Sequence, residues 1–154
     1  MELRRATIRD TEALIRLRIE FLTDGGYRGG EDDLTALEER LRSYFETAIP
    51  TGEFAAVFAE EAGEIASVAY LSVSRRYSRR VESIVPCGMI YNVFTPVAYR
   101  RRGLATLVLK ELLRISEELD LDSVELLASE AGKPLYEKLG FAEPHHTYMV
   151  KRMK

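Results

Sequence analysis

The sequence predicts a single α/β (α+β) domain over residues 1–154, and three observations support this fold class. Short segments with the alternating apolar pattern of strands are interspersed with longer segments whose apolar residues recur every three or four positions, as in amphipathic helices. Glycine and proline mark the boundaries between these segments, and no repeat or linker interrupts them. The chain is 46% hydrophobic and 31% charged, an ordinary composition for a globular domain with a core.

The N-terminal third predicts one strand and two helices. Residues 2–8 alternate weakly and indicate a first strand. A helix is expected over residues 11–22, with Asp10 as its N-cap and a Gly-Gly stop behind it. After a loop at residues 24–33, helical spacing returns at residues 34–48 and ends before a proline and a glycine.

The middle of the chain predicts three strands. Residues 54–59 and 65–73 flank a short turn that contains glycine, so we expect an antiparallel hairpin. Residues 74–85 form a basic loop in this interpretation. The next strand, residues 87–95, is apolar on both faces, which suits the centre of a sheet.

The last third predicts two helices and two strands. A strongly amphipathic helix spans residues 103–119, and the strand at 123–128 follows it, so a crossover between parallel strands is expected. Pro134 suits the first turn of a short helix and Gly140 the residue after its end. Residues 146–150 indicate a closing strand.

The turn between residues 95 and 103 is typical of an anion-binding site. The first turn of a helix leaves backbone N–H groups without partners and carries about half a positive charge, so it can bind a phosphate. Gly103 and Ala105 allow close approach to the backbone, while Arg100, Arg101 and Arg102 add charge in front of it. A nucleotide P-loop is excluded because no Gly-Lys-Ser/Thr follows.

Two motifs together resemble the GNAT superfamily of N-acetyltransferases. Arg100-x-x-Gly103-x-Ala105 matches its acetyl-CoA loop, and Leu135-Tyr136-Glu137-Lys138-Leu139-Gly140-Phe141 matches the Tyr-Glu-x-Leu-Gly-Phe segment that follows in that family. The resemblance covers nearly the whole chain. It implies an acyl-CoA N-acyltransferase fold with a central mixed sheet of about six or seven strands flanked by about four helices, and acetyl-CoA as cosubstrate without a metal.

The resemblance also implies site residues. Tyr136 would be the catalytic acid that protonates the departing CoA thiolate, because a phenol with a pKa near 10 keeps its proton at neutral pH; it would also pack against the cofactor helix. In the family the strand before the loop splays from its neighbour and pairs with the pantetheine arm. The cofactor-binding positions are then Val93, Phe94, Thr95, Arg100, Arg101, Arg102, Gly103, Leu104, Ala105, Thr106 and Ser129. Ser129 replaces the asparagine of many relatives, so its contact departs from the family's pattern.

No general base stands out in the sequence. The chain has no acid between Glu82 and Glu111, where some relatives carry a glutamate on the strand. The remaining candidates, each also compatible with a plain surface role, are Glu82, Glu125, Glu130, His145 and His146. By resemblance, the loop at residues 24–33 is a candidate for lining the acceptor pocket, and a plain connector is the alternative.

Three functions are compatible with these motifs to different degrees. The first is an enzyme that moves an acetyl group from acetyl-CoA to a primary amine of a small molecule or peptide by direct attack in a ternary complex. The second is a non-catalytic acyl-CoA sensor or binding module. A nucleic-acid module built on the arginines of the loop and turn is disfavoured by the net charge of −3 and by the lack of interleaved aromatics. The basic loop, with Arg75, Arg76, Arg79 and Arg80, could meet the 3′-phosphate of CoA, an acidic acceptor or solvent.

Composition sets the remaining expectations. No run approaches the about 20 apolar residues of a membrane helix, and no apolar signal core follows the first residues, so we expect a cytoplasmic protein without a membrane partner. Cys87 is the only cysteine, which excludes an internal disulfide. Two histidines are too few for a dedicated zinc site. A homodimer is compatible with the sequence but is not determined by it.

Overall fold

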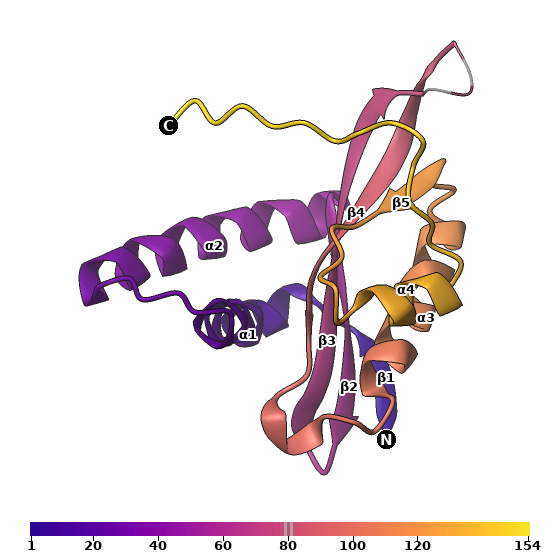
Figure 1. The fold of residues 1–154 in the computed structure, drawn as a ribbon. Coiled ribbons are helices and arrows are strands. Elements are labelled where there is room, and N and C mark those ends of the chain that lie inside the picture. The colour runs from indigo at the N-terminus through magenta and orange to yellow at the C-terminus, as the bar shows by residue number, and fades with distance from the viewer. Residues whose placement is uncertain (79, 81) are drawn as a thin grey trace.

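A computed structural model describes residues 1–78, 80 and 82–154. In this part of the chain, five strands form one sheet in chain order: β1 (Glu2–Arg5), β2 (Phe54–Glu61), β3 (Glu64–Tyr77), β4 (Ile84–Phe94) and β5 (Ser123–Glu125). The helices are α1 (Thr11–Asp24), α2 (Glu31–Thr51), α3 (Leu104–Glu118) and α4 (Lys133–Lys138), with 3-10 turns η1 (Ile8–Asp10) and η2 (Val97–Tyr99). Strands β1 to β4 are antiparallel and β5 is parallel to β4 (Figure 1).

The helices cover both faces of the sheet. Along β2, Phe54, Ala56 and Phe58 join the core under α1 and α2, whereas Ala55, Val57 and Ala59 join the core under α3. Figure 1 shows the two N-terminal helices on one side of the sheet and the two C-terminal helices on the other. A strand buried on both faces reads as a continuous apolar run, which explains the composition of β2 and β3. The mixed sheet with flanking helices confirms the predicted fold class, with fewer strands among the described residues than the six or seven expected.

The β2–β3 hairpin confirms its prediction. Its ladder ends at Glu61 and Glu64, and the two residues between them, Ala62 and Gly63, both have positive φ angles, of 52° and 81°. Two such residues in succession are typical of the tight turn that matches the twist of paired strands.

The region predicted as a basic loop is largely a hairpin. β3 continues through Arg75 and Arg76 to Tyr77 and pairs with β4 from Ile84, so the strands project beyond the helices (Figure 1). Arg76 forms an ion pair with Glu125 at 3.0 Å, and Arg80 forms one with Asp122 at 2.7 Å. The loop prediction is wrong at both ends because the end of β3 is exposed on both faces, so its sequence lacks the apolar alternation by which a strand is recognised. Arg79 lies outside the described residues.

Two helices extend beyond their predicted bounds. α1 continues to Asp24, and α2 begins at Glu31 and includes Pro50. Pro50 cannot donate to the carbonyl four residues before it, but the helix ends directly afterwards, at Gly52 in the left-handed conformation (φ 79°), so few helical bonds are affected.

The predicted closing strand at residues 146–150 is wrong for this structure. Residues 142–154 form neither helix nor strand, and all of them are exposed. Alternation indicates an extended chain, but a strand also needs an edge to pair with, which a single segment of sequence does not identify. None of the described helices combines the length and the hydrophobicity needed to cross a membrane.

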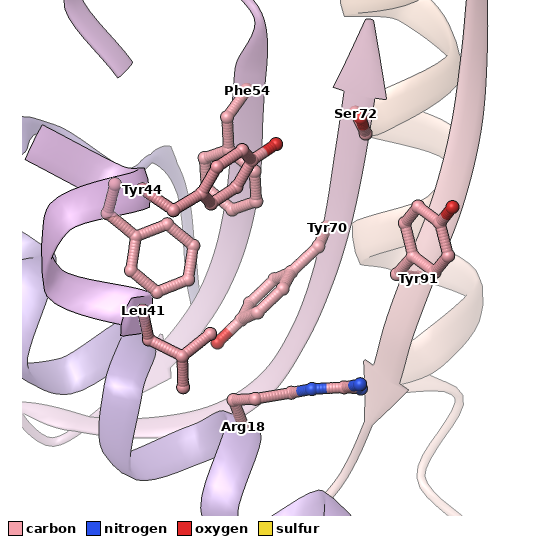
Figure 2. A pocket seen from close by; sticks show the side chains of 8 residues that line it. Arg18, Leu41, Tyr44, Phe54, Tyr70, Ser72 and Tyr91 are labelled. Carbon is pink, nitrogen blue, oxygen red and sulfur yellow. The ribbon is translucent and has the colours of Figure 1, made fainter. Parts of the chain in front are cut away.

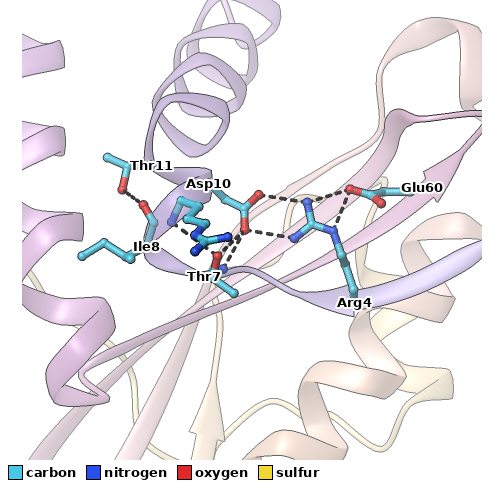
Figure 3. A network of polar contacts seen from close by, with 7 residues as sticks. Arg4, Thr7, Ile8, Asp10, Thr11 and Glu60 are labelled. Carbon is cyan, nitrogen blue, oxygen red and sulfur yellow. Dashed lines mark hydrogen bonds and ion pairs between the residues drawn. The ribbon is translucent and has the colours of Figure 1, made fainter.

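A polar network fixes the start of α1 to the sheet (Figure 3). Arg4 donates two hydrogen bonds to the Asp10 carboxylate, both at 2.9 Å, and a third to Glu60 at 2.9 Å. Asp10 also accepts the Thr7 N–H at 2.7 Å, as part of a capping box on η1. Asp10 therefore precedes α1 as predicted, but its side chain does not cap that helix. The Arg4 guanidinium lowers the pKa of this carboxyl group.

Candidate active site

The predicted cofactor strand separates from its neighbour. β4 pairs with β5 only through Cys87–Ser123, Gly88–Val124 and Met89–Glu125, although β4 continues to Phe94. From Ile90 onward, this edge of β4 has no strand partner among the described residues. Unpaired backbone N–H and C=O groups at such an edge can bind an extended ligand as an added strand.

A cavity of about 380 Å³ lies where β4 and β5 separate. Predicted site residues from three different segments meet in it: Val93 on β4, Ser129 after β5, and Tyr136 on α4. We call it the thioester cavity. The rest of its lining comes from Arg18, Phe21, Met89, Ile90, Tyr91, Asn92, Leu126 and Leu127.

Tyr136 has the environment of a protonated phenol. Its ring packs edge-on against Phe141, with centroids 6.1 Å apart, and a Cβ on Gly132 would lie 3.0 Å from it. Partial burial raises the pKa of Tyr136, because the phenolate is less well solvated there. No described residue hydrogen-bonds to its hydroxyl group. Tyr136 is thus held by packing while its proton remains available in the cavity.

Ser129 stabilises the turn before α4. Its Oγ accepts the Gly132 N–H at 3.1 Å, and its carbonyl accepts the Lys133 N–H at 2.9 Å. The hydroxyl can still donate to a ligand in the thioester cavity.

The start of α3 has the features of an anion site. Gly103, the residue before Leu104, has a φ angle of 76°, and a Cβ placed on it would meet nothing within 4 Å. The backbone conformation therefore favours glycine, and the space in front of the turn is open. The buried Leu104 side chain anchors the helix. No described residue accepts the N–H groups of Leu104, Ala105 or Thr106, as expected for a first helical turn.

The three arginines of this turn have different environments. Arg100 donates to the Thr95 carbonyl at 2.9 Å and forms an ion pair with Asp24 at 2.9 Å. Arg102 forms a two-point pair with Glu61, at 2.9 and 2.6 Å. Arg101 is exposed, has a φ angle of 63° and has no ion-pair partner among the described residues. Only Arg101 therefore keeps its charge uncompensated.

Phe94 and Thr95 direct their side chains into the protein. Phe94 is 7% exposed and packs edge-to-face with Phe21 at 6.2 Å. The Thr95 hydroxyl lies 2.8 Å from that of Ser67. These two positions can contact a cofactor mainly through their backbone groups.

A second cavity, of about 270 Å³, lies under α1 and α2 and was not predicted from the sequence (Figure 2). We call it the aromatic cavity. Arg18 of α1 and Tyr91 of β4 line both cavities. Its other lining residues are Leu41, Tyr44, Phe45, Phe54, Tyr70 and Ser72. The sequence feature that could have indicated this cavity is Arg18, a charged residue between the apolar residues Leu17 and Ile19 of α1.

Tyr70 has a structural role in the wall of the aromatic cavity. It is 4% exposed, and its hydroxyl donates to the Leu14 carbonyl at 2.5 Å. Burial strongly raises its pKa, so the phenol stays protonated and links β3 to α1.

Asn92 lies at an irregularity of β4. The register between β3 and β4 shifts in the region of Tyr70, and Asn92 has a φ angle of 53°. Its side-chain Oδ1 accepts a hydrogen bond from Arg18 Nη1 at 3.2 Å, while its buried Nδ2 has no partner. Since Arg18 can only donate, it fixes the orientation of the amide.

The candidate bases are not brought to either cavity. Glu82, Glu130, His145 and His146 are exposed and line neither of them, and Glu125 is paired with Arg76. Residues 25–30, between α1 and α2, also line neither cavity. The described residues contain no group of three side chains that could bind a metal ion.

Comparison with known proteins agrees with this geometry. Residues 14–141 match the sequence profile of the acetyltransferase (GNAT) family. A sequence search among curated proteins found no significant match.

Several solved structures share the fold. A predicted acetyltransferase from Clostridium acetobutylicum, solved with acetyl-CoA, has a TM-score of 0.83 at 24% identity, over 97% of this chain and 95% of that one. A GCN5-related N-acetyltransferase from Ralstonia eutropha has a TM-score of 0.80 at 21% identity, over 97% of both chains. Glucosamine-6-phosphate N-acetyltransferase from Arabidopsis thaliana has a TM-score of 0.73 at 22% identity, over 99% of this chain and 98% of that one.

Proposed function

This chain belongs to the GNAT family of acetyltransferases, and we propose that it transfers an acetyl group from acetyl-CoA to a primary amine of a small molecule or peptide. The observation that carries the proposal is the position of Tyr136: a half-buried phenol with a raised pKa and a free hydroxyl in the cavity beside the open edge of β4. The family and the fold support the use of acetyl-CoA as cosubstrate.

The cofactor would be held mainly by the backbone. The N–H groups of Arg101 to Thr106, with Gly103 leaving space, would bind the pyrophosphate. The free edge formed by Val93, Phe94 and Thr95 would pair with the pantetheine arm, and Ser129 would donate to it from the opposite wall. Arg100 would hold the turn in place, and Arg101, whose charge is not compensated by a described carboxylate, would add positive charge; Arg102 is paired with Glu61.

The acetyl group would pass directly between the two substrates. Acetyl-CoA supplies a thioester whose carbonyl carbon accepts an amine. The neutral amine forms the new C–N bond as the C–S bond breaks, a β4 N–H at Val93 or Phe94 stabilises the oxygen, and Tyr136 gives its proton to the departing sulfur. The proton lost by the amine leaves through solvent and restores the phenol. The products are an amide and free CoA.

A second candidate is a binding module that holds acyl-CoA without turnover. It is favoured by one observation: the described linings of both cavities contain no carboxylate or imidazole that could take the amine proton. One experiment separates the two candidates. Amines, aminoglycosides, amino acids and N-terminal peptides are incubated with acetyl-CoA while free thiol is recorded and acetyl-CoA binding is measured by calorimetry. Thiol release that depends on an amine supports transfer, whereas tight binding without release for every acceptor supports the module.

A further inference from the structure

Arg18 is a cation without a counter-charge at the junction of the two cavities. It is half-buried, and burial lowers the pKa of its guanidinium, although not enough to remove its charge. No described carboxylate forms an ion pair with it, whereas Arg16 on the same helix pairs with Glu20 at 3.0 Å. A partly buried charge without a partner is costly, so a site that retains one is suited to an anionic ligand.

Asn92 adds an independent observation at the same point. The residue is 4% exposed, and its Nδ2 is a donor without a partner in the wall of the thioester cavity. Its Oδ1 accepts a hydrogen bond from Arg18, so the two side chains are in direct contact. The guanidinium has no counter-charge and the amide Nδ2 has no acceptor, a combination that suits the oxygens of a single anion.

The aromatic cavity determines what the rest of the ligand should be. Tyr44, Phe45, Phe54 and Tyr70 contribute aromatic rings, and Arg18 is the only charged residue in its described lining. In Figure 2 the Arg18 side chain extends from α1 toward β4, below Tyr70 and Tyr91. An apolar or aromatic body is favoured in this space, and a polycation is disfavoured by the guanidinium.

We propose that the acceptor in the transfer reaction proposed above is an amine with a carboxylate next to it and an apolar or aromatic body, as in a free aromatic α-amino acid. Arg18 and Asn92 Nδ2 bind the carboxylate where the two cavities meet. The neighbouring amine then lies in the thioester cavity near Tyr136, and the body occupies the aromatic cavity. Acetylation of this amine rests on the proposed function, whereas binding of its carboxylate does not.

The test compares phenylalanine with phenethylamine, which lacks only the carboxylate. We expect kcat/KM for phenylalanine to be at least about a hundred-fold higher, because a site built to bind a polar group rejects the analogue without it. Arg18→Met should abolish this preference, so that phenylalanine is acetylated no faster than phenethylamine. Arg16→Met, which removes a charge from the same helix outside both cavities, should leave both the preference and CoA affinity unchanged.

Equal rates for the two amines, or an unchanged preference in Arg18→Met, would overturn the inference, as would a higher rate with O-phosphoethanolamine than with phenylalanine. If no amine is acetylated, binding of N-acetylphenylalanine to the CoA complex is measured by calorimetry. Binding that is lost in Arg18→Met but kept in Arg16→Met supports the carboxylate site even though transfer has failed. No binding in the wild-type protein counts against the site itself.

Discussion

The proposed cofactor side and the proposed acceptor side of the site would use different atoms. At the start of α3 and along the free edge of β4, the groups available to a ligand are backbone N–H and C=O groups, and Gly103 keeps them accessible. In the aromatic cavity, side chains from α1, α2, β2, β3 and β4 form the surface. A site made of backbone groups constrains a few residues that are neighbours in the sequence, so it can be recognised as a sequence motif. A pocket lined by side chains from distant parts of the chain has no such motif.

The largest expected effect is on the chemical step, at the boundary of the two sides. Tyr136→Phe removes only a hydroxyl group, so we expect the rate to fall by about a hundred-fold to ten-thousand-fold, the usual contribution of general acid catalysis. Acetyl-CoA affinity should stay within a few-fold. The measurements are acetyl transfer at saturating amine and separate calorimetry. An unchanged rate without a pre-steady-state burst would leave Tyr136 a packing residue, whereas a burst would show that a later step limits turnover.

Gly103→Val tests whether the cofactor side depends on the backbone. A β-branched residue resists the positive φ of this position, at about 1–3 kcal/mol, and its side chain would project into the open space where the pyrophosphate is placed. We expect CoA affinity to fall by about a hundred-fold or more. Gly103→Ala is the control with less bulk. A folded Gly103→Val variant that binds CoA normally would remove the anion site from this turn.

The arginines provide a finer test of the same side. Arg100→Ala should weaken CoA binding by roughly fivefold, equivalent to about 1 kcal/mol, because the Thr95 and Asp24 contacts that hold the turn are lost. Arg101→Ala and Arg102→Ala should have smaller effects that diminish further in moderate salt. Calorimetry at two salt concentrations measures this. If Arg101→Ala or Arg102→Ala weakens CoA binding more than Arg100→Ala, bulk charge rather than positioning governs the site.

The smallest effect on ligand binding is expected for a change that acts on the stability of the proposed acceptor side. Asp10→Asn should lower the free energy of unfolding by about 1–2 kcal/mol at pH 7, because Asp10 accepts charge-assisted bonds from Arg4. The pKa of Asp10 is lowered in the folded state, so its contribution is present above the unfolded-state pKa of about 4 and is lost as the pH falls below it. Urea unfolding of both proteins from pH 7 to pH 3 measures the difference. A difference that does not shrink between pH 7 and pH 3 would contradict the assignment to the ionised carboxylate.

Short-range sequence patterns were enough to predict the elements of the proposed cofactor side. The strand before Thr95, the glycine turn and the amphipathic helix are neighbours in sequence, and the conformation of each depends on residues within a few positions of it. The start of α3 at Leu104, the β2–β3 hairpin and the mixed α/β architecture were therefore predictable. The approach of Tyr136 and Ser129 to β4 followed from the family resemblance rather than from spacing.

Only the tertiary structure decided the acceptor side and the position of the C-terminus. Arg18 and Asn92 are 74 residues apart in the sequence, and neither shows in its local pattern that the other is its partner. Residues 146–150 have a strand-like pattern, yet they are unpaired, because pairing depends on an edge supplied from elsewhere. The propensity and the apolar periodicity of a sequence segment indicate whether it forms a helix or a strand. Whether a charged side chain finds a partner, or a strand finds an edge to pair with, depends on the residues that folding places beside it.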